Sequence, residues 1–137
     1  MARDELTDGS VLRYNFLWSH ERAAGREEGR KPGRTNVLAK RLLFEGEEWI
    51  LILPITSLEP AAGTPSYELS DLEVRRSGLR GPAPLWVILD EVNFEPVTRS
   101  YNLEPDAKIG DLGQPTYRAI LRAFRDAYAQ ARKTRRA

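Results

Sequence analysis

The sequence predicts a mainly β domain, a small, partly closed barrel or strongly bent sheet of five or six short strands followed by one C-terminal helix. Two observations predict this fold. Apolar residues before residue 104 occur in short runs, some with a period of two, separated by Pro, Gly and charged residues. From residue 116 the apolar period becomes that of an amphipathic helix. With 137 residues, of which 41% are hydrophobic, the chain suits a single domain spanning residues 1–137.

The first half of the chain predicts three strands, at residues 11–18, 35–44 and 49–56. In the first, every second residue from Leu12 to Trp18 is aromatic or aliphatic, which is typical of a half-buried strand. Glu45-Gly46-Glu47 is a hairpin signal between the second and third strands. The third is apolar on both faces and predicts a buried central strand, with Pro54 at its end or at a bulge.

The second half predicts a short strand at 67–69, one or two helical turns at 71–78, strands at 84–94 and 98–103, and a helix from 116. In this helix Tyr117, Ile120, Leu121 and Phe124 form one apolar face, which we expect to pack on the sheet. Pro115 suits its first turn.

Three segments carry no core signal. Residues 19–33 contain no large apolar residue and predict a long loop of the kind that is functional or disordered. Residues 1–8 and 132–137 are expected to be flexible tails. We interpret the cationic run from Arg132 to Arg136 as a solvated helix end in preference to a binding segment.

Composition excludes several kinds of site. With no Cys and a single His, His20, the chain has no disulfide, thiolate nucleophile, Cys-based zinc site or all-His metal site. The longest apolar run, residues 49–55, is too short to span a membrane, so we expect a cytoplasmic protein without a membrane partner. A net charge of +1 gives no global attraction for nucleic acid, so any polyanion site must be local.

Six short motifs occur in an order that is informative when they are taken together. They are the opening segment Gly9–Trp18, His20-Glu21, Gly33-Arg34-Thr35-Asn36, Pro54-Ile55-Thr56-Ser57, Leu89-Asp90-Glu91-Val92 and Gly110-Asp111-Leu112. In this order the chain resembles, over residues 9–130, the MazF/PemK (Kid) family of toxins from bacterial toxin–antitoxin modules. The resemblance depends on the joint order of the motifs and not on any one of them.

The resemblance implies an SH3-like barrel of the CcdB/MazF type with a C-terminal amphipathic helix. It also implies a metal-independent, sequence-specific endoribonuclease, an mRNA interferase that cleaves single-stranded RNA and needs no cofactor. Such a toxin acts as a homodimer and is neutralised by an antitoxin protein, whose disordered tail occupies the RNA groove.

Cleavage without a metal ion requires the RNA 2′-hydroxyl to attack the adjacent phosphorus, with a base, an acid and donors for the developing charge. Carried onto this sequence, the resemblance implies that the catalytic residues are Arg34, Thr56, His20 and Asp90. The RNA-binding residues would be Glu21, Arg30, Lys31, Ser57 and Asn93. Tyr14 and Trp18 are available to stack on bases, although aromatic residues in strands more often fill the core.

Two departures from the family pattern leave alternatives open. The loop before Arg34 is longer than is usual in the family, so that Lys31 or Arg30 could take the place of the family arginine. The PemK branch has an arginine where this chain has Ile88, so one cation of the family site is missing. A non-catalytic CcdB-like inhibitor and an SH3-like interaction module are therefore alternative functions.

Overall fold

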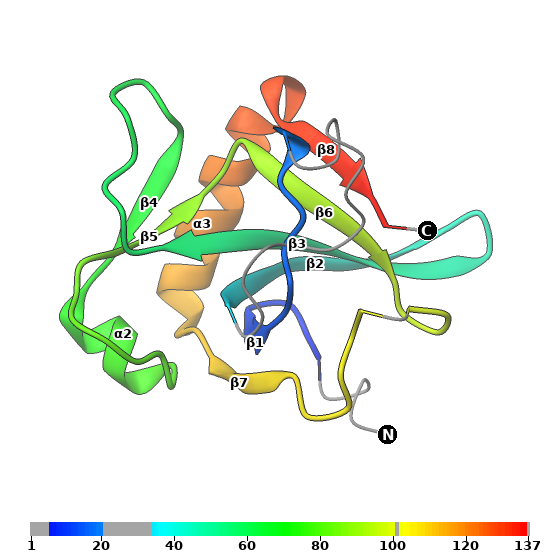
Figure 1. Ribbon diagram of the computed structural model, residues 1–137, viewed down its shortest axis with the longest axis horizontal. Helices are drawn as coiled ribbons and strands as arrows, with labels where there is room; N and C mark the ends of the chain where they lie inside the picture. The colour runs from blue at the N-terminus through cyan, green and yellow to red at the C-terminus, as the bar shows by residue number, and fades with distance from the viewer. Residues whose placement is uncertain (1–5, 21–33, 101, 137) are drawn as a thin grey trace.

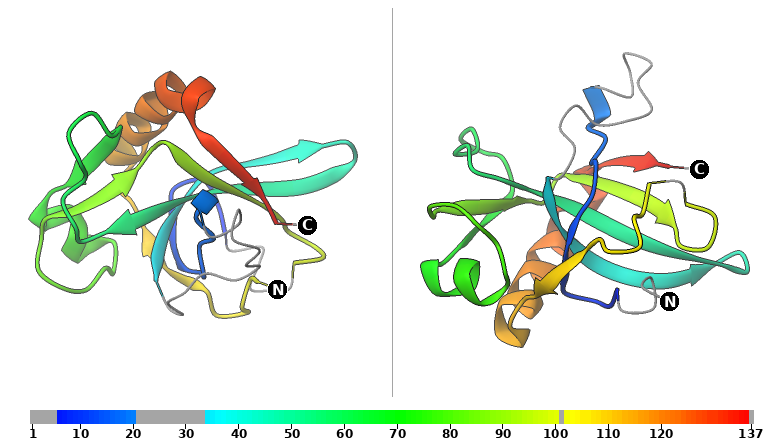
Figure 2. Two further views of the ribbon diagram at one scale, coloured as in Figure 1. Left: turned by 45° about the horizontal axis from the view of Figure 1, so that its top comes forward. Right: turned by 60° about the horizontal axis from the view of Figure 1, so that its bottom comes forward.

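The structure, a computed structural model, describes residues 6–20, 34–100 and 102–136. A strongly curled sheet of eight strands forms a half-barrel, and one long helix near the C-terminus crosses its outer side (Figures 1 and 2). The mainly β, barrel-like fold predicted from the sequence is confirmed. Within the described ranges, no helix combines the length and the apolar character that crossing a membrane requires.

The strands are β1 (Ser10–Arg13), β2 (Thr35–Phe44), β3 (Glu47–Thr56), β4 (Ser66–Leu69), β5 (Leu85–Ile88), β6 (Glu91–Pro96), β7 (Lys108–Asp111) and β8 (Arg132–Arg135). The helices are α2 (Asp71–Arg76), α3 (Gln114–Ala127) and the short 3-10 helix η2 (Tyr128–Gln130).

The central strand β3 organises the sheet, whose hydrogen-bonded order is β4-β5-β3-β2-β1-β7. One edge of β3 pairs along its length with β2, and the two strands are joined by a tight turn at Glu45 and Gly46, both with positive φ. The other edge pairs first with β6 and then with β5. Pro54 lies inside β3 between these two partners, where neither β5 nor β6 pairs with it, and so the sheet tolerates a residue without an N–H.

Two apolar clusters hold the sheet. The larger lies between the sheet and α3, where the predicted helix face contributes Tyr117, Ile120 and Phe124. The smaller lies on the other face of the sheet and includes Leu12, Tyr14 and Phe16 from the opening segment. The apolar alternation of residues 11–18 therefore predicted the buried face correctly.

The opening strand is shorter than predicted, since β1 ends at Arg13. Beyond it, side-chain amides bind backbone groups that a neighbouring strand would otherwise pair. Asn36 Nδ2 donates to the carbonyl of Tyr14 at 2.9 Å, and Asn93 bonds both the N–H and the carbonyl of Leu17, at 2.9 and 2.8 Å. Because these bonds come from side chains and not from a neighbouring strand, β1 ends at Arg13 although the apolar alternation continues beyond it.

The strand predicted at 84–94 is two strands. β5 pairs with β4 and the end of β3, whereas β6 pairs with the beginning of β3, so the chain is interrupted at Leu89 and Asp90. The strand predicted at 98–103 is wrong, because the described residues of that range, 98–100 and 102–103, form none. The short strand and helical turns predicted before residue 84 correspond to β4 and α2.

Two strands were not predicted. β7 pairs with β1, and β8 runs parallel to β6 where a solvated tail was expected. β8 contains no apolar residue and packs through its polar side chains instead. Thr134 is buried at 5% exposure, and Lys133 and Arg135 lie over the rings of Tyr128 and Trp49. The expected N-terminal tail is also wrong at Leu6, which is 2% exposed.

Candidate functional site

A shallow recess of about 440 Å³ lies where β3 ends and β2 begins. Its wall contains Arg34, Thr35, Ile55, Thr56, Ser57, Leu58, Arg80 and Leu85. We call it the arginine recess. It brings together Arg34, Thr56 and Ser57, three of the residues proposed from the sequence. Lys31 and Arg30, the alternatives to Arg34, lie outside the described residues, as does Glu21.

Strand register brings Arg34 to Thr56. Asn36 pairs with Pro54, so continuing the antiparallel register by two residues sets Arg34 opposite Thr56. The carbonyl of Arg34 accepts hydrogen bonds from the Tyr14 N–H at 3.0 Å and from Asn36 Nδ2 at 3.1 Å. These bonds hold the Arg34 backbone to the opening segment and leave its guanidinium for the recess.

The Thr56 hydroxyl acts as an acceptor within its own turn, and its proton takes no part in that bond. Its oxygen accepts a hydrogen bond of 3.1 Å from the Leu58 N–H, in the turn that follows β3. Since a hydroxyl has one proton and two lone pairs, this bond leaves the proton available to an incoming acceptor. An anionic oxygen in the recess would therefore find an O–H donor beside the guanidinium.

Arg80 is a cationic residue of the recess that the sequence pattern did not predict. It lies in the loop between α2 and β5, and this loop is held against β7 at Gly78. Gly78 has φ +85, and a side chain there would meet Ile109 Cγ2 at 2.9 Å. In the sequence, the only signal near Arg80 was Ser77-Gly78, which predicted the end of a helix. The position of the loop that carries Arg80 depends on the pairing of β7 with β1.

The arginine recess is cationic. No carboxylate contributes to its described wall. Among the described residues, no Asp or Glu lies within ion-pair distance of Arg34 or Arg80, and both side chains reach the surface. Two unpaired guanidinium groups together with a free hydroxyl proton favour an anion such as phosphate, which arginine binds through two parallel N–H groups.

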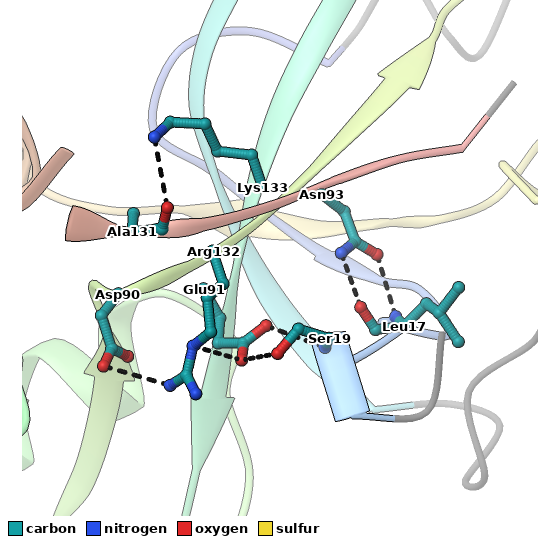
Figure 3. Close-up of polar contacts among 8 residues, drawn as sticks. All are labelled: Leu17, Ser19, Asp90, Glu91, Asn93, Ala131, Arg132 and Lys133. Carbon is teal, nitrogen blue, oxygen red and sulfur yellow. Dashed lines mark hydrogen bonds and ion pairs between the residues drawn. The ribbon is translucent and has the colours of Figure 1, made fainter. Parts of the chain in front are cut away.

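His20 and Asp90 are not brought to this recess. Asp90 pairs with Arg132 at 3.4 Å, at the start of β8 (Figure 3). His20 is exposed and stacks on Trp18, with 6.4 Å between the ring centres. The preceding residue, Ser19, is held by Glu91 through a hydroxyl bond of 2.7 Å and an N–H bond of 3.1 Å. Among the described interactions, none joins Asp90 to Arg34 or His20.

Asn93 is a structural residue, which corrects its expected contact with RNA. It is 0% exposed, and both ends of its side-chain amide are bound to the backbone of Leu17 (Figure 3). It belongs to a polar row on one face of β6, formed with Glu91 and Glu95, which are 3% and 0% exposed. This polar row holds the opening segment, so its side chains are enclosed by protein.

Tyr14 is likewise enclosed and is not available to stack on a base. Its hydroxyl donates to Glu95 Oε1 at 2.6 Å and accepts from Arg136 Nη1 at 2.8 Å. Burial, reinforced by the charge of Glu95, raises the pKa of Tyr14 well above its ordinary value. Trp18 remains half-buried, with its ring against Phe16 at 5.2 Å.

Among the described residues, the other candidate positions do not combine unpaired cations with a hydroxyl donor as the arginine recess does. Ile88, where the resemblance implied an arginine, is buried at 6% exposure and pairs with Ser66 of β4. An apolar groove of about 460 Å³ lies between the β2–β3 hairpin and β8, but Arg135 and Lys133 lie over the rings of Trp49 and Tyr128. In the described ranges no cluster of three His, Asp or Glu side chains is suited to a metal ion.

Comparison with known proteins adds no assignment to this geometry. No protein-family model matches the chain, and a search of curated proteins finds no match to it.

Proposed function

We propose that the protein binds single-stranded RNA at the arginine recess and cleaves it without a metal ion, by attack of the RNA 2′-hydroxyl on the adjacent phosphorus. The observation that carries the proposal is the convergence of Arg34, Arg80 and the Thr56 hydroxyl on one recess with no carboxylate in its described wall. This set of donors matches the oxygens of a phosphodiester.

In the proposed reaction, a bond forms between the 2′-oxygen and phosphorus while the bond from phosphorus to the 5′-oxygen breaks. The products are a 2′,3′-cyclic phosphate and a free 5′-hydroxyl. Negative charge increases on the nonbridging oxygens, where Arg34 and Arg80 stabilise it and Thr56 donates a hydrogen bond. The 2′-hydroxyl proton leaves to solvent, and the 5′-oxygen takes a proton from solvent.

Proton transfer through solvent predicts a slow enzyme. No imidazole or carboxylate lines the described wall of the recess, and a positioned general acid or base contributes about 10²- to 10⁴-fold to a rate. The same observation favours a second candidate function, a non-catalytic module that binds a phosphate-containing partner. The expected antitoxin and homodimer stay predictions.

The test is incubation of the purified full chain with end-labelled single-stranded RNA in EDTA. Cleavage that leaves cyclic phosphate ends supports the ribonuclease. Arg34→Ala, Arg80→Ala and Thr56→Val should each lower the rate about 10²-fold, the scale for one donor to a transition-state oxyanion. Arg118→Ala is the matched control, because Arg118 is an exposed arginine on α3, outside the recess.

Two outcomes contradict the proposal. If Arg34→Ala cuts RNA at the rate of the unmodified chain, the recess is not the cleavage site. If the RNA stays intact in EDTA and in magnesium while it still binds in an Arg34-dependent way, the non-catalytic module is the better description. Purifying every variant by the same procedure separates these results from a contaminating nuclease, whose activity would not follow Arg34.

A further inference from the structure

A second concave surface adjoins the arginine recess. It has a volume of about 630 Å³ and is lined by Arg13, Thr35, Gly78, Arg80, Lys108 and Ile109. Thr35 and Arg80 line both recesses, so the two lie side by side. We call the combined surface the basic track. It runs from Thr56 and Ser57 at one end to Arg13 and Lys108 at the other.

The basic track has four cationic side chains and no carboxylate in its described wall. Two acids among the described residues lie beside it. Asp106 is 85% exposed and lies 3.8 Å from Arg13, and Asp111 lies 3.3 Å from Lys108. Solvent-exposed ion pairs contribute little stability, so an incoming phosphate can replace Asp106 as the partner of Arg13 at small cost.

The wall of the track is held in shape by backbone packing. β1 pairs with β7 through Leu12 and Lys108, which fixes the positions of the neighbouring cations. The loop before Arg80 contacts β7 so closely at Gly110 that any side chain there would overlap the Ser77 carbonyl. A carboxylate oxygen of Glu73 in α2 accepts the Gly113 N–H at 2.6 Å, which ties α2 to the beginning of α3.

We propose that the basic track binds at least two consecutive phosphodiesters of one RNA strand, with Arg80 shared between them. Arg34 and Thr56 hold the phosphate that is cleaved, and Arg13 and Lys108 hold its neighbour. No aromatic side chain lines the described wall of either recess, so this contact is to the backbone and independent of base identity. The proposal rests on the proposed function for its ligand, and binding can be measured without cleavage.

The test uses 2′-O-methyl oligoribonucleotides, which have no 2′-hydroxyl to attack and so cannot be cleaved by this reaction. Binding of the full chain is measured over a range of salt concentrations with a dinucleotide containing one phosphodiester and with a hexanucleotide. Loss of one phosphate contact should reduce the slope of log affinity against log salt by about 0.7 for a single strand. Arg34→Ala should weaken binding of both oligonucleotides, whereas Arg13→Ala and Lys108→Ala should weaken only that of the hexanucleotide.

A gain-of-binding variant guards against misfolding. Asp106→Asn removes the exposed acid beside Arg13 and should strengthen hexanucleotide binding by up to about fivefold, the range of a surface ion pair. Asp126→Asn, at an exposed position of α3, changes the net charge equally and is the matched control. Because loss of the fold would disperse the cations of the track, an increase that is confined to Asp106→Asn, with an unchanged circular dichroism spectrum, supports the track.

The outcomes separate the two proposals. If the unmodified chain binds neither oligonucleotide, the proposed function and the track both fail. If it binds in an Arg34-dependent way, but Arg13→Ala, Lys108→Ala and Asp106→Asn leave affinity and salt slope unchanged, the track is overturned and the proposed function stands. Equal strengthening by Asp106→Asn and Asp126→Asn would also overturn the track, because net charge alone would then explain the effect.

Discussion

The guanidinium of Arg136 donates a hydrogen bond of 2.8 Å to the hydroxyl of Tyr14, which joins the last described residue to the opening segment. The same hydroxyl donates to Glu95, which is 0% exposed, and the Tyr14 N–H donates to the carbonyl of Arg34. The network therefore connects β8 and β6 to the backbone of a recess residue. We expect changes in this network to affect stability first and the recess second.

Replacing Tyr14 by Phe should destabilise the fold by about 1–3 kcal/mol. The change removes a hydroxyl bound to Glu95 and Arg136 and leaves buried polar groups without that partner. Urea unfolding measures the loss. Tyr67→Phe is the control, because Tyr67 is half-buried and has no hydrogen bond to its hydroxyl among the described interactions. Equal stability of the two variants would contradict the role given to Tyr14.

Ending the chain after Ala131 should lower the melting temperature, whereas removing Ala137 alone should not. The larger deletion removes the pairing of β8 with β6, the bonds of Arg136 and the side chain of Thr134. Each hydrogen bond to a charged group contributes about 1.5–3 kcal/mol. Calorimetry of both truncated chains makes the measurement. A fully stable chain ending at Ala131 would mean that β8 contributes nothing to the folded state.

Stability should fall between pH 10 and 12, in part because of Tyr117. Burial, together with the nearby charge of Asp8, raises the pKa of Tyr117 to about 12, and its hydroxyl donates to the Ala39 carbonyl at 2.8 Å. The unfolded chain loses this proton near pH 10 while the folded chain keeps it, so the contribution is complete below pH 10 and is lost as the pH rises toward 12.

The measurement is urea unfolding at several pH values for the unmodified chain and for Tyr117→Phe. The variant should be less stable at pH 8, by about 0.5–1.5 kcal/mol for the lost hydrogen bond. The difference between the two chains should shrink as the pH approaches 12. A difference that is constant with pH would show that the folded and unfolded states release this proton together.

Replacing Gly110 by Ala should weaken oligonucleotide binding without removing any charge. The new methyl group would overlap the Ser77 carbonyl and displace the loop that carries Arg80. Gly113→Ala is the control, since a side chain there meets only the movable end of Arg76, at 3.1 Å. Circular dichroism must first establish that both variants fold. Unchanged salt dependence of binding in folded Gly110→Ala would contradict positioning of Arg80 by this contact.

Replacing His20 by Gln should lower the rate of RNA cleavage by much less than about 10²-fold, which is the smallest loss expected when a general acid or base is removed. His20 stacks on Trp18 and does not line the arginine recess. The cleavage rate in EDTA of the variant and of the unmodified chain is the measurement. A loss of about 10²-fold or more in His20→Gln would return the histidine to the catalytic site.

Sequence pattern determined the features that depend on contacts between near neighbours. Alternation identified the buried face of the opening segment, and the unbroken apolar run identified β3 as the central strand. The turn at Glu45 and Gly46 follows from local chemistry, and so does the helix after Pro115. These signals are local because side-chain period and turn geometry are set within a few residues.

Tertiary structure alone decided the rest. β8 has no apolar pattern, and its strand exists because β6 offers a free backbone edge and two rings accept Lys133 and Arg135. The motifs that contain Arg34 and Thr56 could be recognised in the sequence, but the two residues lie in one recess because of the register between β2 and β3. Arg80 joins them only because β7 packs against the loop at Gly78, a contact between residues about thirty positions apart that leaves no periodic signal in the chain.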